Sequence, residues 1–124
     1  MLKDKRLIVK LSDKANETYE LLLQNVEKEN LNGIKSSFHQ TLLKSIERAV
    51  NSLKQNPFSG NQIPKRLIPE KYKRLYDAEN IWRIELFDFW RLVYTINGNQ
   101  LEIISFILDI FDHKEYDKTF GYKG

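Results

Sequence analysis

The sequence predicts a single α+β domain, residues 1–124, in which an antiparallel two-helix hairpin packs on one face of a small sheet. Apolar residues recur at helical spacing through the first half, and short, mostly apolar runs typical of strands fill the second. Hydrophobic residues make up 41% of the 124-residue chain, enough to bury a core. The order of strand, two helices and three strands predicts a four-stranded, mostly antiparallel sheet followed by a short C-terminal tail.

The N-terminal half begins with a strand at residues 6–11, which is rich in residues that favour strands. Ser12 or Asp13 is expected to cap the first helix, because its side-chain oxygen can accept a free backbone N–H. The buried stripe of this helix comprises Ala15, Tyr19, Leu22, Leu23 and Val26. A polar break at 30–33 precedes a second helix, expected from about Ile34 to Leu53. Its inward-facing residues should be Ile34, Phe38, Leu42, Ile46, Ala49, Val50 and Leu53.

Three further strands are expected at roughly 80–87, 90–96 and 100–110. The pair Asn97-Gly98 should form the turn between the last two, because both residue types accept the positive φ that a tight turn requires. The final strand is nearly all apolar, as expected of a central strand that is covered on both faces.

Composition excludes several classes of function. The chain has no cysteine, which excludes disulfides, a thiolate nucleophile and a cysteine-based zinc site. Its two histidines, His39 and His113, are too few for a multi-histidine metal site, so we expect no metal and no other cofactor. We interpret His39 as a residue on the flank of the second helix. The charged N-terminus has no apolar signal core behind it, and no apolar run approaches the roughly 20 residues of a membrane span, so we expect a soluble, cytoplasmic protein.

Charge is unevenly distributed, although the net charge is only +3. Residues 12–30 contain five acidic and two basic residues, whereas residues 64–74 contain five basic residues and one acidic residue. The basic residues are Lys65, Arg66, Lys71, Lys73 and Arg74. This basic segment is either a solvated loop or a surface that attracts polyanions.

Residues 81–94 have the pattern of a hairpin that carries two arginines and a glutamate on apolar, aromatic strands. The apolar residues share one face only if an odd-numbered loop, such as Phe87-Asp88-Phe89, joins the strands, because a one-residue slip reverses every side chain. That register turns Trp82, Ile84, Leu86, Trp90, Leu92 and Tyr94 toward the helices. The opposite face then gathers Arg83, Glu85 and Arg91, with Glu85 roughly opposite Arg91.

These three charged residues have two interpretations. The simpler is a cross-strand salt bridge on a solvent-facing sheet, contributing about 0.2–1 kcal/mol. The other is a phosphate site, because the basic segment leads into the hairpin and two residues able to shuttle protons, His113 and Tyr116, follow the last strand. A metal-free ribonuclease needs a base for the ribose 2′-hydroxyl, an acid for the leaving 5′-oxygen and fixed cations for the phosphoryl charge. Arginine suits the last task because its planar fork matches phosphate oxygens.

The element order, the run Trp-Arg-Leu-Val-Tyr at 90–94 and the ending His-Lys-Glu-Tyr at 113–116 together resemble the RelE/ParE superfamily of toxins from type II toxin–antitoxin systems. The resemblance covers nearly the whole chain, from Lys5 to about Tyr116. RelE-like members are small cytoplasmic ribonucleases that enter the ribosomal A site, cut the mRNA there and are held inactive by a cognate antitoxin. The resemblance therefore implies a metal-independent mRNA endoribonuclease that inhibits translation.

The resemblance also implies roles for individual residues. Arg91 matches the arginine that contacts the scissile phosphate, and Arg83 supplies a second cation. His113 or Tyr116 matches the C-terminal active-site residues and would be the general acid. Glu85 is a possible base, weakened by its pairing with Arg91, since a nearby opposite charge lowers the basicity of a carboxylate. Lys65, Lys71 and Lys73 lie where other members carry cations for the phosphate or the ribosomal RNA. From the charge of the basic segment, we expect Arg66 and Arg74 to join them in binding RNA or the ribosome.

Three features depart from the family pattern. His113 and Tyr116 are separated by two residues rather than adjacent. Arg83 and Glu85 stand where some RelE proteins carry paired lysines, and the chain continues through 120–123 past the usual end. The assignment of acid and base therefore stays open, as do two other functions. One is a ParE-like inhibitor that poisons DNA gyrase by contact, and the other is a catalytically inactive interaction module with the toxin fold.

Overall fold

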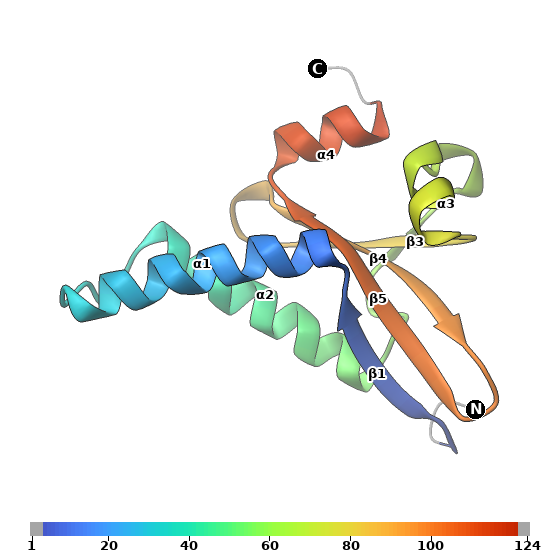
Figure 1. Cartoon of the computed structure of the whole chain (residues 1–124), viewed down its shortest axis with the longest axis horizontal. Coiled ribbons are helices and arrows are strands. Elements are labelled where there is room, and N and C mark those ends of the chain that lie inside the picture. Colours follow the sequence, from blue (N-terminus) through green and yellow to red (C-terminus); the bar gives the residue numbers. More distant parts are fainter. Residues whose placement is uncertain (1–3, 122–124) are drawn as a thin grey trace.

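The structure, a computed structural model, describes residues 4–121. Four helices and five strands make up this part of the chain, arranged as Figure 1 shows. In chain order they are β1 (Arg6–Leu11), α1 (Asp13–Leu31), α2 (Phe38–Gln55), β2 (Asn61–Ile63), α3 (Glu70–Tyr76), β3 (Ile81–Glu85), β4 (Arg91–Gly98), β5 (Glu102–Phe111) and α4 (His113–Phe120). Short 3₁₀ turns occupy Lys65–Leu67 and Phe87–Phe89. The α+β class predicted from the sequence is confirmed.

The five strands form one sheet in the order β1-β5-β4-β3-β2. Strand β1 runs parallel to β5, and the other neighbours are antiparallel. The prediction of four strands missed β2, a three-residue edge strand that pairs with β3. Only Ile63 of β2 is buried, so the segment carries no alternating pattern. Strand β5 lies between β1 and β4, which confirms the central position predicted for the final strand.

Helices α1 and α2 form an antiparallel hairpin on one face of the sheet (Figure 1). Ser12 caps α1 by accepting the Ala15 N–H at 3.0 Å, and its hydroxyl donates to the Leu108 carbonyl oxygen at 2.7 Å. The cap therefore also ties the start of α1 to β5. The buried residues of this layer, called the first core here, are Ala15, Leu22, Leu42, Leu43, Ile46, Ala49, Leu53, Leu86, Leu92, Tyr94, Ile107 and Ile110.

Helix α2 begins at Phe38 rather than near Ile34. Ser37 caps it by accepting the Gln40 N–H at 3.1 Å, and this capping bond sets where the helix starts. Ile34 and Phe38, both predicted to face inward, are 43% and 42% exposed. The helix predicted from the apolar spacing therefore begins about one turn too early.

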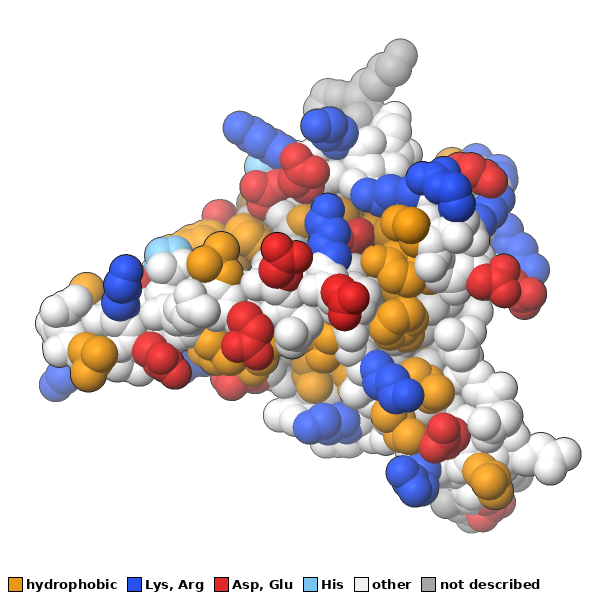
Figure 2. Space-filling model, viewed as in Figure 1, with side chains coloured by type: hydrophobic (Ala, Val, Ile, Leu, Met, Phe, Trp, Pro, Cys, Tyr) orange, Lys and Arg blue, Asp and Glu red, His pale blue; other side chains and the backbone are white. Residues whose placement is uncertain are grey.

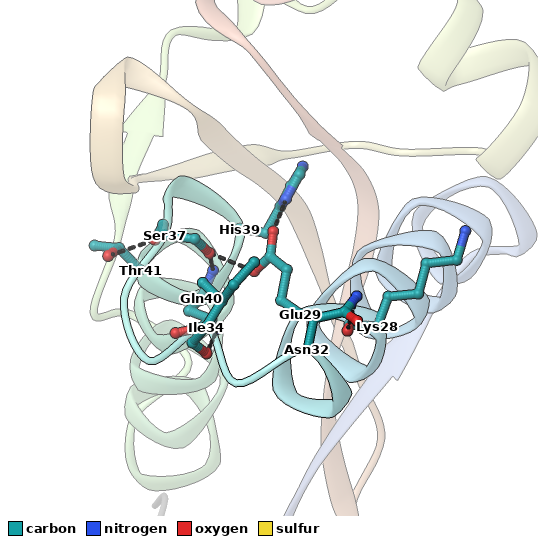
Figure 3. A network of polar contacts seen from close by, with 8 residues as sticks. All are labelled: Lys28, Glu29, Asn32, Ile34, Ser37, His39, Gln40 and Thr41. Atoms are coloured by element: carbon teal, nitrogen blue, oxygen red, sulfur yellow. Dashed lines mark hydrogen bonds and ion pairs between the residues drawn. The ribbon is translucent and has the colours of Figure 1, made fainter.

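The tip of the α1–α2 hairpin is fastened by Glu29 (Figure 3). Its carboxylate accepts the Ser37 hydroxyl and contacts Nδ1 of His39 at 2.7 Å. These two hydrogen bonds, that from Ser37 first, lower the pKa of Glu29. His39 is thus more than a residue on the flank of α2, since it links the two helices.

The opposite face of the sheet is covered by α3 and α4, which corrects the prediction that helices pack on one face only (Figure 1). The segment predicted to be a short tail forms α4, capped by Asp112, whose side chain accepts the Glu115 N–H at 2.9 Å. Gly121 ends α4 with a φ of 73°, and residues 122–123 of the predicted tail lie outside the described residues. The second core on this face consists of Ile63, Ile68, Tyr72, Ala78, Ile81, Val93, Leu108, Phe111, Tyr116 and Phe120.

The turn between β4 and β5 does not use Asn97-Gly98 as predicted. Strand β4 continues through Gly98, which is not among the described residues with positive φ. The Asn99 side chain closes the turn by accepting the N–H groups of Leu101 and Glu102 at 2.8 and 3.0 Å. An asparagine that bonds the backbone ahead of it makes the turn without the positive-φ pair.

We predict that the stability of the fold decreases in alkali partly because of Tyr94. Its buried hydroxyl donates to the Pro57 carbonyl oxygen at 2.8 Å and accepts the Gly60 N–H at 3.1 Å. Burial raises the pKa of Tyr94 from 10.0 to about 12. A raised pKa in the folded state means that this stabilisation is complete below about pH 10 and is lost as the pH rises to about 12. The free energy of unfolding, measured by urea denaturation at each pH, should fall over this range.

Tyr94→Phe should show a shallower fall with pH. At neutral pH it should be destabilised by about 1–3 kcal/mol, because the Pro57 carbonyl and the Gly60 N–H lose their partner. Tyr76→Phe, at a half-buried tyrosine of α3, serves as the control. An unchanged pH dependence in Tyr94→Phe contradicts the prediction.

Candidate functional site

The β3–β4 hairpin brings the three predicted charged residues onto the sheet face that α3 and α4 cover. The register pairs Glu85 with Arg91 and Ile84 with Leu92, which confirms the odd-numbered loop. Arg83 lies two positions before Glu85 on β3, on the same face. The apolar set packs against the first core, as predicted, and comprises Trp82, Ile84, Leu86, Trp90, Leu92 and Tyr94.

Arg91 is held by groups on three sides. Its Nη2 lies 3.7 Å from Oε1 of Glu85, and its Nη1 donates to the Phe89 carbonyl oxygen. Its guanidinium carbon lies 5.2 Å from the centre of the Tyr116 ring, within the range of a cation–π contact. The Arg91 side chain is 14% exposed and that of Glu85 is 63% exposed. The Nε of Arg91 is buried and has no acceptor among the described residues, a costly arrangement for a charged group.

Tyr116 joins the two arginines. Its hydroxyl accepts a hydrogen bond from Nη1 of Arg83 at 2.7 Å, and the Arg83 guanidinium carbon lies 5.7 Å from the ring centre. The residue is 1% exposed, and its ring packs 4.6 Å from that of Phe120 in the second core. The hydroxyl therefore reaches solvent only if the side chains around it move.

His113 lies at the first position of α4 and is exposed. Its ring lies 6.4 Å from that of Phe89, at an interplanar angle of 70°. His113 and Tyr116 are three residues apart on one helix, so they lie on the same side of α4.

The basic segment 64–74 is not a loop, since it contains a 3₁₀ turn and α3. Lys65, Arg66, Lys73 and Arg74 are exposed. Lys71 is half-buried, with its Nζ 5.4 Å from the Tyr72 ring centre. Basic side chains gather over α3 at the upper right of Figure 2, and acidic ones run along α1. The structure therefore places this segment on the same sheet face as Arg83 and Arg91.

The sequence analysis missed a buried polar pair on this face. The Tyr72 hydroxyl donates to Oδ2 of Asp109 at 2.7 Å, and Asp109 is 4% exposed. The register of β4 with β5 skips Leu108 between Val93 and Tyr94, and this bulge turns Asp109 toward α3. Burial, and then the neighbouring carboxylate, raise the pKa of Tyr72. An aspartate among the apolar residues in the second half of β5 was the available signal.

Residues 4–121 contain no group of three or more His, Cys, Asp or Glu side chains that could hold a metal ion. Nor does this part of the chain include a helix that is long and apolar enough to cross a membrane. The site instead combines two guanidinium groups, a carboxylate, a phenol and an imidazole. Such a set can bind an anion and move protons.

No family model and no curated protein matches the sequence. Among solved structures, the chain is similar to the YoeB/ParE toxin from Agrobacterium tumefaciens, with a TM-score of 0.55 and 14% sequence identity. The match covers 86% of this chain and 98% of that one. The chain thus has the α+β fold of a YoeB/ParE toxin, which confirms the RelE/ParE-like fold that the sequence resemblance implied.

We predict that Tyr116→Phe destabilises the fold by about 1–2 kcal/mol, because Arg83 loses the acceptor of a charged hydrogen bond while the ring packing remains. Urea denaturation measures the change. Tyr76→Phe, which keeps the ring contacts of Tyr76 with Tyr72 and Phe106, should be nearly neutral. Equal stability of Tyr116→Phe and the wild type would mean that the Arg83 contact contributes nothing to folding.

Proposed function

We propose that this protein is a RelE-like toxin, a cytoplasmic, ribosome-dependent mRNA endoribonuclease that a cognate antitoxin neutralises. The toxin fold supports the class of protein. The observation that carries the catalytic part is the convergence of Arg83 and Arg91 on Tyr116, with Glu85 and His113 at the rim of the same face.

In this proposal Arg91 binds the scissile phosphate. Its partner Glu85 is 63% exposed and lies 3.7 Å from Nη2 of Arg91, a separation longer than that of a hydrogen-bonded ion pair. A phosphate can therefore take the place of Glu85 at low cost. The Nε of Arg91 has no acceptor in the described chain. Rotation of the guanidinium toward a bound phosphate would give this N–H an acceptor, which favours the exchange. Arg83 supplies the second cation, steadied by the Tyr116 hydroxyl.

The solvent exposure of the two candidates, His113 and Tyr116, decides which of them we propose as the general acid. His113 is exposed at the start of α4, whereas Tyr116 is 1% exposed and engaged by Arg83. We therefore assign proton donation to His113 and the orientation of both arginines to Tyr116. Imidazole suits the task because it exchanges protons near neutral pH.

Glu85 is the proposed base. Displaced from Arg91 by the phosphate, it takes the proton of the ribose 2′-hydroxyl, whose oxygen then forms a bond to phosphorus. The bond from phosphorus to the 5′-oxygen breaks, and His113 protonates that oxygen. The products are a 2′,3′-cyclic phosphate and a 5′-hydroxyl end. The arginines stabilise the charge that builds on the phosphoryl oxygens.

A second candidate function is inhibition of DNA gyrase by binding to it without catalysis, as in the ParE-like members of the superfamily. The observation that favours it is the burial of Tyr116, together with the engagement of Arg91 by Glu85 and the Phe89 carbonyl. A toeprinting assay on translating ribosomes, run beside a gyrase supercoiling assay on plasmid DNA, separates the two functions. Site-specific mRNA cleavage supports the ribonuclease, and intact mRNA with blocked DNA supercoiling supports the contact inhibitor.

We predict that Arg91→Ala lowers ribosome-dependent cleavage by about 10²–10³-fold, the effect of removing one preorganised stabiliser of transition-state charge. Arg91→Lys should restore activity only in part, since an ammonium keeps the charge but not the two-pronged geometry. The melting temperature is measured on the same proteins. If Arg91 serves only as a structural ion-pair partner, the loss of activity will follow the loss of stability instead.

Arg48→Ala is the matched control, because Arg48 is an exposed arginine on α2, on the other side of the sheet. It should retain full activity. A folded Arg91→Ala protein that cleaves at the wild-type rate would remove the ribonuclease assignment.

We predict that binding to ribosomes or RNA weakens steeply with salt, since exposed cations on the basic segment release counterions from phosphates. The double variant Lys73→Ala/Arg74→Ala should lower the slope of log K against log salt by about 1.4, or roughly 0.7 per contact to a single strand. Filter binding at several salt concentrations measures the slope. Lys44→Ala/Arg48→Ala on α2 is the control with equal charge loss. Equal slopes for the two double variants would make the basic segment a solvated surface.

A further inference from the structure

The loop between β3 and β4 has an unusual backbone. Asp88 and Phe89 both adopt left-handed conformations, with φ of 56° and 61°. The loop is closed on either side by the Leu86 N–H, which donates to the Trp90 carbonyl at 2.8 Å, and by the Trp90 N–H, which donates to the Phe87 carbonyl at 3.2 Å. These two bonds close the loop at its base and enclose Asp88 and Phe89.

Folding alone does not explain a phenylalanine at this position. The other described non-glycine residues with positive φ are Asp77 and Asp88, and aspartate tolerates this region because its short side chain bonds locally. A bulky aromatic residue there is an outlier. A three-residue hairpin loop would ordinarily place glycine at such a position. Burial offers no compensation, because Phe89 is 67% exposed.

Strained residues of this kind gather where they have a function. The Phe89 ring lies 6.4 Å from the His113 ring and nearly perpendicular to it. The Phe89 carbonyl oxygen accepts the Nη1 of Arg91. A single residue thus positions the proposed phosphate-binding guanidinium with its backbone and presents an open aromatic face with its side chain. The neighbouring Phe87 belongs to a different cluster, with its ring 5.7 Å from that of Phe38.

We propose that the Phe89 ring, supported by its edge contact with His113, is a stacking site for one base of single-stranded RNA, next to the phosphate that Arg91 binds. Base and phosphate belong to one nucleotide, so a ring and a guanidinium two residues apart on the same hairpin suit a single nucleotide. Stacking on an aromatic ring tolerates every base, because each base has a π-face. The site therefore binds the nucleotide without selecting the identity of its base. This inference rests on the proposed function for the identity of the ligand.

The test uses binding without cleavage. Two fluorescein-labelled hexamers are titrated onto the full chain by anisotropy at low salt. One is a hexamer of deoxyadenosine, and the other is an abasic hexamer with the same phosphates. Neither has a 2′-hydroxyl, so neither can be cut. The wild type should bind the adenine hexamer about tenfold more tightly, within the range of stacking one base on an aromatic side chain.

Phe89→Gly should abolish this preference and leave the affinity for the abasic hexamer unchanged. Its melting temperature should equal or exceed that of the wild type, because glycine adopts positive φ without strain. Phe89→Trp should keep the preference, and Arg91→Ala should weaken both hexamers. Phe58→Ala is the control, since Phe58 is 49% exposed and its ring lies 5.5 Å from that of Trp82, a residue on the opposite sheet face.

Two results would overturn the stacking site. One is a wild type that binds both hexamers equally or not at all. The other is a Phe89→Gly protein that keeps its preference for the adenine hexamer. Failure of the proposed function looks different, because a protein with base-dependent binding but no ribosome-dependent cleavage retains the stacking site and loses the ribonuclease assignment.

Discussion

The pairing of Glu85 with Arg91 across the β3–β4 hairpin is the constraint on which the candidate site depends. In this register the large apolar side chains of both strands reach the first core, and the charged ones reach the other face. A slip of one residue would turn Arg91 into the first core and expose Trp82 and Trp90. The hydrophobic effect acting on α1 and α2 therefore fixes the position of charges that face away from those helices.

Packing on the other face completes the arrangement. Tyr116 is both a buried member of the second core and the group on which the two arginines converge. Helix α4 has only eight residues, and a helix this short is not stable without tertiary contacts. Its docking through Tyr116 and Phe120 places the tyrosine ring and hydroxyl against Arg83 and Arg91.

Periodicity predicted the parts of the fold that repeat a simple pattern. The helix stripe of α1, the Ser12 cap and the hairpin register follow from local rules, because a buried face leaves its period in the sequence. The structure of β2, α3 and α4 depends on partners instead. Asp112 and Glu115 at the start of α4 and Gly121 at its end are ordinary helix-boundary signals in the sequence. The two buried aromatic residues of α4 are stabilising only because the second face of the sheet is there to pack against.

The site's finer geometry was beyond such rules. The register predicted that Arg83, Glu85 and Arg91 share a face, but not that a tyrosine from α4 would take the Arg83 hydrogen bond. The left-handed Phe89 and the bulge at Leu108 were equally hidden, because both contradict the preference of the residue or strand concerned. Sequence rules describe the average conformational preference of each residue type, and the residues of a functional site often depart from that preference.

Two energetic costs lie close together on the hairpin. Phe89 adopts a strained backbone, and the Nε of Arg91 is buried without an acceptor in the described chain. A sequence optimised for folding alone would avoid each of them. The β4 residues that follow, Leu92, Val93 and Tyr94, are fully buried between the two cores and hold the strand firmly enough to tolerate these costs. Strain and unmet hydrogen bonding thus lie beside the most deeply buried part of β4, and this is the arrangement on which the proposed anion site is based.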